Sequence, residues 1–104
     1  MTYAFRIDTG VKIQFLLALI TILFSLWLDL TPLEWMIILL CIGCVICAEL
    51  LNTAIEKTLD AIPNLNDKQV GHIKDISAGA VLTISIISFI IMIIIILGKG
   101  VITL

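Results

Sequence analysis

The feature that most constrains this chain is a run of 22 uncharged residues, Ile76 to Leu97, which ends in ISFIIMIIIIL. A helix rises about 1.5 Å per residue, so about 20 apolar residues cross the hydrocarbon core of a bilayer. Hydrophobic residues make up 62% of the 104 residues. A soluble domain of this length buries only about 60–70% of the surface that its unfolded chain exposes. The composition therefore predicts one membrane domain rather than a soluble one.

Two further apolar segments precede this run. Ile13–Leu28 is interrupted only by uncharged polar residues, and Trp35–Ala48 continues as a helix past Glu49. In the turn between them, Thr31 and Pro32 suit the N-cap and first turn of a helix. Later, IPNLNDKQVGH has the composition of a loop. We expect an all-α fold with three transmembrane helices, at about 11–29, 32–60 and 74–97, with a loop at 61–73.

Basic residues are distributed unevenly about these segments. The positive-inside rule places the side richer in Lys and Arg in the cytoplasm. We therefore expect the N-terminus and the 57–75 connection to be cytoplasmic, and the 29–34 turn and the C-terminus to face outward.

A net charge of -2 without a polybasic tract gives no indication of nucleic-acid binding. The cytoplasmic set is Arg6, Lys12, Lys57, Lys68 and Lys74, against Lys99 alone outside.

A polar face on the second helix is the main candidate for chemistry. In ELLNTAIEKTLD, the residues Glu49, Asn52, Thr53, Glu56 and Asp60 fall within about 100° of one helix face. A carboxylate at membrane depth costs a few kcal/mol on insertion scales. Such a group therefore usually faces a cavity, pairs with another polar group or has a function. The alternative is that the face is only the solvated end of a long helix, and geometry alone leaves both readings open.

The predicted topology favours a functional role for this face. It brings Asp8, Lys12, Lys74 and Asp75 to the same side of the membrane. Such a set can bind Mg²⁺, which takes one or two carboxylates together with phosphate oxygens and water. It also supplies a lysine for phosphate charge and a carboxylate that accepts a hydroxyl proton. Neither a P-loop nor a Gly-x-Gly-x-x-Gly motif is present, so an ATP-using enzyme here is of another type.

With these residues in view, the chain resembles the prokaryotic diacylglycerol kinase family, whose members include undecaprenol kinases. The family signature reads Glu-x-aliphatic-Asn-Ser/Thr-Ala-Ile-Glu-x-x-Val-Asp, and ELLNTAIEKTLD departs from it only at Leu59. A second block, Lys-Asp followed by small residues, corresponds to KDISAGAVL from Lys74 to Leu82. The resemblance covers roughly residues 5 to 97.

The resemblance implies a bacterial inner-membrane homotrimer with shared active sites, which transfers phosphate from ATP with Mg²⁺ to a lipid hydroxyl, that of undecaprenol or diacylglycerol. Glu49 corresponds to the catalytic base and Asn52 to a polar partner beside it. The remaining implied roles are metal binding by Asp8 and Glu56, nucleotide binding by Asp8, Glu56, Lys74 and Asp75, and support by Lys12 and Asp60.

Some positions depart from the family pattern. The N-terminal amphipathic surface helix is almost wholly missing, and Asp8 is one methylene shorter than the usual Glu. Leu65, Asn66 and Asp67 replace the usual Glu-Tyr-His. The stretch AGAV at Ala78–Val81 is more similar to the undecaprenol kinase branch. Two alternatives therefore stay open: an inactive or regulatory family member, and a non-enzymatic oligomer such as a proton-carrying subunit that uses Glu49.

Three cysteines follow one another at every third position of the second segment. They lie at membrane depth with no fourth ligand nearby, so we interpret them as small packing residues rather than a metal or redox site. The cysteines are Cys41, Cys44 and Cys47.

Overall fold

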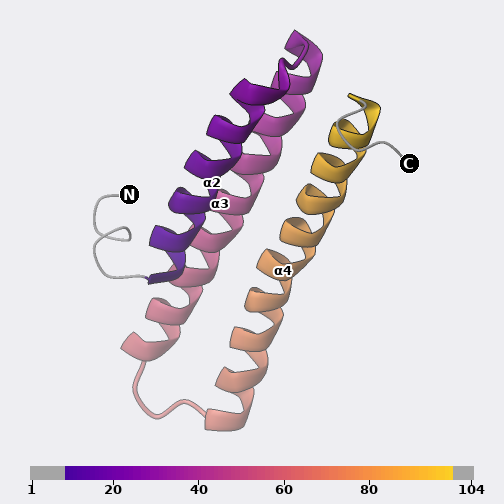
Figure 1. Ribbon diagram of the computed structural model, residues 1–104. Coiled ribbons are helices and arrows are strands. Elements are labelled where there is room, and N and C mark those ends of the chain that lie inside the picture. Colours follow the sequence, from indigo (N-terminus) through magenta and orange to yellow (C-terminus); the bar gives the residue numbers. More distant parts are fainter. Residues whose placement is uncertain (1–8, 100–104) are drawn as a thin grey trace.

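The computed structural model describes residues 9–99, which form three helices running up, down and up (Figure 1). The helices are α2 (Thr9–Leu28), α3 (Pro32–Ala61) and α4 (Asp67–Gly98). All three are long and apolar enough to cross a membrane. The all-α fold with three candidate membrane spans is therefore confirmed.

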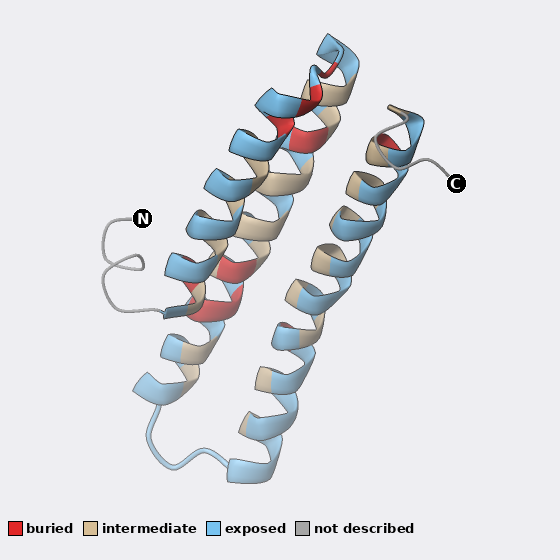
Figure 2. Cartoon of the chain, viewed as in Figure 1, coloured by how far each residue is buried: buried red, intermediate tan, exposed pale blue. Residues whose placement is uncertain are grey.

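The middle helix, α3, organises the bundle, because α2 and α4 both pack against it and barely against each other. We call the end that carries residues 29–31 the turn end, and the end that carries residues 62–66 the linker end. Exposed residues cover most of each helix, and the few buried ones gather in two groups, one near the turn end and one partway along the bundle toward the linker end (Figure 2). Such a surface suits lipid, since hydrocarbon tails solvate apolar side chains that water would force inside.

At the turn end, a capping box starts α3. The Thr31 hydroxyl accepts from the Glu34 backbone N–H at 3.3 Å, and the Glu34 carboxylate accepts from the Thr31 N–H at 3.0 Å. Pro32 occupies the first turn, where its missing N–H costs nothing. The expected N-cap at Thr31 is confirmed. Lys99 then ties α4 to this turn, through an ion pair with Glu34 and a hydrogen bond to the Asp29 carbonyl.

A small apolar cluster stabilises the same end. Trp35 packs against it as a partly buried residue. Its buried members come from the end of α2, the turn, α3 and α4, so the cluster fixes all three helices at one level. These members are Leu28, Leu30, Ile38 and Ile95.

At the linker end, the structure corrects the predicted loop at 61–73, because α4 begins at Asp67 rather than near Lys74. The Asn66 side chain caps this helix by accepting from the N–H groups of Lys68 and Gln69, at 2.9 and 3.2 Å. This cap satisfies two of the N–H groups that a helix start leaves unpaired. The single Gly71 weakens the helix too little to end it.

We predict that Asn66→Ala lowers the free energy of unfolding by about 1 kcal/mol, because it removes the N-cap of α4. Asn66→Asp is the matched control, since aspartate caps equally well. Unfolding by denaturing detergent, followed by circular dichroism, measures both. Equal stability of the wild type and Asn66→Ala would contradict the role of the cap.

Candidate active site

The polar face of α3 is partly turned into the protein at the linker end. Glu49, Asn52 and Thr53 are buried, Glu49 with only 8% of its surface exposed. Glu56 is half-buried and Asp60 is exposed. Exposure thus rises along the face from Glu49 outward, so its carboxylates meet increasingly aqueous surroundings.

A buried chain of hydrogen bonds joins this face to α4. The Ser77 hydroxyl donates to the Asn52 side-chain oxygen at 2.6 Å. The Asn52 amide then donates to a carboxylate oxygen of Glu56 at 3.2 Å. Because the Ser77 hydroxyl already donates to the amide oxygen, the NH₂ group is the part of the amide that faces Glu56. The chain fixes the Asn52 amide and orients the Glu56 carboxylate.

Glu49 lies one helical turn from this chain, on the side toward the middle of the helices. Its backbone carbonyl accepts from the Thr53 hydroxyl at 3.0 Å. The Thr53 hydroxyl is therefore hydrogen-bonded within its own helix, as most buried hydroxyls are. A buried carboxylate at this position is the kind of group that usually has a function in a membrane protein.

A second polar contact joins α3 and α4 farther out. The Lys74 ammonium forms an ion pair with the Asp60 carboxylate at 2.9 Å, and both side chains are exposed. Lys74 is also near enough to Glu56 for their charges to interact. An exposed ion pair adds little to stability. The pair instead holds the positive charge of Lys74 beside the polar face of α3.

The structure brings together only part of the predicted site. Glu49, Asn52 and Glu56 share one face, and the Lys74–Asp60 pair joins that face to α4. The expected support residue Lys12 is exposed near the start of α2, and Asp75 is exposed on α4. Asp8 lies outside the described residues.

Ser77 is the residue that sequence reasoning missed. It stands three positions after Lys74, so both lie on the same side of α4. It is also buried, with 8% of its surface exposed. The signal in the sequence is a hydroxyl two positions after Asp75, at the start of the small-residue stretch Ser77–Ala80.

Of the two residues that we expect to bind a metal ion, Asp8 and Glu56, only Glu56 lies within the described part of the chain. Across residues 9–99, no three His, Cys, Asp or Glu side chains lie close enough together to hold a metal ion. Mg²⁺ needs only one or two carboxylates when phosphate oxygens and water complete its shell. The half-buried and oriented carboxylate of Glu56 fits that kind of donor set.

The three cysteines separate onto two sides of α3. Cys41 is half-buried, whereas Cys44 and Cys47 are exposed, and all three are free thiols. Cys44 and Cys47 line one shallow hollow of α3 that Cys41 does not line, so the three thiols do not form one site.

We predict that Ser77→Ala lowers the free energy of unfolding by about 1 kcal/mol, since it leaves the buried Asn52 oxygen without its donor. Ser88→Ala is the matched control on the same helix, because the buried Ser88 hydroxyl has no hydrogen-bond partner among the described residues. That change should be neutral or slightly stabilising. Equal losses in the two variants, measured by detergent unfolding, would contradict the proposed importance of the Ser77 contact.

Comparison of the sequence with known proteins identifies the family of the chain. The model of the family described as prokaryotic diacylglycerol kinase matches residues 1–96. An undecaprenol kinase from Bacillus subtilis is 46% identical over 71 residues, which cover 68% of this chain and 58% of that relative, so the chain spans less than two thirds of the relative's length. No solved structure matched the chain. The protein belongs to the prokaryotic diacylglycerol kinase family.

Proposed function

We propose that the protein transfers the γ-phosphoryl group of ATP to the hydroxyl of a membrane lipid, undecaprenol or diacylglycerol. The observation that carries this proposal is the graded face of α3, with Glu49 buried, Glu56 oriented by Asn52, and Lys74 held beside Asp60. Such an order suits a reaction between a substrate in lipid and a co-substrate in water. Undecaprenol is favoured by the name of the Bacillus relative.

In this proposal, Glu49 is the general base. Its carboxylate accepts the proton of the lipid hydroxyl as the hydroxyl oxygen forms a bond to the γ-phosphorus. The bond from that phosphorus to the bridging oxygen breaks, and ADP leaves. A positioned base contributes about 10²–10⁴-fold to such a reaction. Its place beside the apolar part of α3 suits a lipid hydroxyl that lies near the membrane surface.

The remaining polar residues bind and orient the phosphates. Glu56, held by Asn52, would ligate Mg²⁺ together with Asp8, and Mg²⁺ supplies positive charge to the phosphate oxygens. Lys74 adds a second positive charge, and Asp60 holds its ammonium in place. Asp75 and Lys12 are proposed to contact the nucleotide and to support the site. Positioning and electrostatics account for most of the catalysis in phosphoryl transfer.

We propose that the linker end faces the cytoplasm of a bacterial inner membrane. Lys57, Lys68 and Lys74 lie toward that end, whereas Lys99 lies at the turn end. This distribution follows the positive-inside rule. A cytoplasmic linker end would also put the proposed site on the side where ATP is present.

We further propose a homotrimer with active sites shared between neighbouring chains. An exposed side of α3 supports this proposal, because small residues there form a shallow hollow that lets another helix approach closely. They include Gly43, Cys44, Cys47 and Ala48.

We predict that Glu49→Gln lowers kcat for lipid phosphorylation by at least about 100-fold, because glutamine cannot accept a proton. The assay is transfer of labelled phosphate from ATP to undecaprenol or diacylglycerol in mixed micelles. Glu34→Gln is the matched control, a glutamate of the same helix at the turn end. It should keep near wild-type activity.

Two results would contradict the proposal in different ways. Undiminished activity of Glu49→Gln would remove Glu49 as the base while leaving the kinase in place. A folded wild type that phosphorylates neither lipid would remove the kinase itself. Proton conductance of that inactive protein in vesicles would then support the proton-carrying alternative.

A further inference from the structure

A hydroxyl of α4 determines which way round the Asn52 amide lies. A carboxylate only accepts hydrogen bonds, so the NH₂ group of the amide faces Glu56 and donates to its Oε1 at 3.2 Å. The amide oxygen then faces Ser77, whose hydroxyl donates to it at 2.6 Å. Ser77 and Asn52 are both buried, where a polar group needs a partner within the protein. Ser77 therefore holds the amide in the orientation that gives Glu56 a donor, and we call Ser77, Asn52 and Glu56 the relay.

The relay makes the two oxygens of the Glu56 carboxylate unlike each other. Oε1 accepts the Asn52 N–H, whereas Oε2 has no hydrogen-bond partner within residues 9–99. The hydrogen-bonded oxygen has one lone pair occupied, and the positive end of the amide lies beside it. A cation held by both oxygens would meet that positive end, whereas a cation held by Oε2 alone would avoid it. The relay thus favours one oxygen of this carboxylate as the metal ligand.

Magnesium and calcium differ in how they use a carboxylate. Mg²⁺ binds oxygens at about 2.0–2.1 Å in near-ideal octahedral geometry, and the short span between the two oxygens of one carboxylate does not fit octahedral angles. Ca²⁺ binds oxygens at about 2.3–2.6 Å in flexible geometry and often takes both oxygens of one carboxylate. A carboxylate restricted to one oxygen therefore suits Mg²⁺ and deprives Ca²⁺ of a ligand.

We propose that Ser77 is a positioning residue that acts through Asn52 to make Glu56 a one-oxygen ligand, and thereby favours Mg²⁺ over Ca²⁺. This inference rests on the proposed function, in which Glu56 binds the metal ion, and adds the residue that sets the choice of metal. Ser77 itself contacts neither the metal ion nor a substrate. The consequence for the reaction is positional, because a displacement of about 1 Å at a reacting centre costs about 100-fold in rate.

The relay also makes the metal ligand depend on how α4 is seated. Ser77 lies three residues after Lys74 on that helix, so both lie on the same side of it. Lys74 pairs with Asp60 at 2.9 Å, and its charge interacts with that of Glu56. The same helix therefore supplies the hydroxyl that restricts Glu56 and a positive charge near it. The two keep a fixed relation as long as α4 stays packed on α3.

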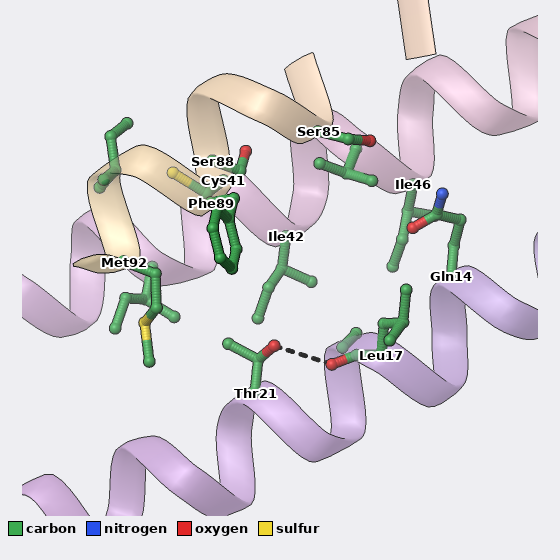
Figure 3. A pocket seen from close by; sticks show the side chains of 14 residues that line it. Gln14, Leu17, Thr21, Cys41, Ile42, Ile46, Ser85, Ser88, Phe89 and Met92 are labelled. Atoms are coloured by element: carbon green, nitrogen blue, oxygen red, sulfur yellow. Dashed lines mark hydrogen bonds between the residues drawn. The ribbon is translucent and has the colours of Figure 1, made fainter. Parts of the chain in front are cut away.

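A second buried hydroxyl on α4 provides the matched control. Ser88 lies eleven residues farther along, toward the turn end, and its hydroxyl has no hydrogen-bond partner within residues 9–99. It lines a groove over α3, between α2 and α4, together with Thr21 and Phe89 (Figure 3). None of the relay residues lines this groove. Ser88→Ala thus removes a buried hydroxyl from the same helix without touching the relay.

The first test measures the choice of metal and does not require lipid phosphorylation. Mn²⁺ bound to the protein and a non-hydrolysable ATP analogue is displaced by Mg²⁺ or Ca²⁺ and followed by electron paramagnetic resonance. A titration without protein gives the share of metal that the nucleotide alone holds. We expect Ser77→Ala to weaken Mg²⁺ binding by about tenfold, the lower end of what lost support of a metal ligand costs. Ca²⁺ binding should stay within about twofold, because Ca²⁺ gains the second carboxylate oxygen.

Two results of this titration would overturn the inference. One is an unchanged ratio of Mg²⁺ to Ca²⁺ affinity in Ser77→Ala. The other is an equal change of that ratio in Ser88→Ala, since the loss of any buried hydroxyl on α4 would then have the same effect.

The second test reads the coordination of Glu56 directly. The gap between the symmetric and antisymmetric carboxylate stretches is wide for a one-oxygen ligand and narrow for a two-oxygen ligand. Infrared difference spectra of protein labelled with ¹³C-glutamate are recorded on addition of Ca²⁺ with the same analogue, and the Glu56 bands are identified by their loss in Glu56→Gln. We expect a wide gap in the wild type and Ser88→Ala, and a narrow gap in Ser77→Ala. The same gap in the wild type and Ser77→Ala would overturn the inference.

These measurements separate failure of the inference from failure of the proposed function. A protein that phosphorylates no lipid, but whose choice of metal depends on Ser77, would sustain the relay and remove the kinase. A lipid kinase whose metal affinities and infrared gap are unaffected by Ser77→Ala would sustain the kinase and remove the role of the relay. A wild type without any metal-dependent Glu56 band would overturn the inference whatever its activity, because Glu56 would then not be a metal ligand.

Discussion

The hydrogen bond from Ser77 to Asn52 is the contact on which the linker end of this molecule depends. In a bilayer, apolar side chains gain little by turning toward one another, so polar contacts and close packing decide how helices associate. The bond joins residues 25 positions apart and is buried between α3 and α4. It also orients Glu56 through the Asn52 amide. One interaction therefore serves both the packing of two helices and the arrangement of the candidate site.

The bundle is fastened at its two ends and open between them. At the turn end, Lys99 binds Glu34 and the Asp29 carbonyl, beside the small apolar cluster. At the linker end, the Ser77–Asn52 bond and the Lys74–Asp60 pair hold α4 on α3. Between these levels α2 and α4 stay apart, which leaves the groove.

Much of this fold could be predicted from the sequence, because membrane-spanning length and apolar composition are properties of single segments. The cap at Thr31 and the polar face from Glu49 to Asp60 were predictable for the same reason, since each depends on residues close in sequence. The start of α4 was predicted wrongly: Pro63 and the asparagines of the linker were extended into a loop through His72, whereas the Asn66 cap starts the helix at Asp67. Ser77 and the groove depend on how α4 lies on α3, which no local pattern specifies.

Asn52 and Ser77 bond to each other and thereby couple α3 to α4. A double-mutant cycle with Asn52→Ala, Ser77→Ala and the double variant tests it most directly, with the free energy of unfolding in detergent as the measured quantity. We expect a coupling energy of about 1 kcal/mol, because the double variant loses the shared bond only once. Effects that add to within about 0.3 kcal/mol would contradict it, since they would mean that the two side chains act independently.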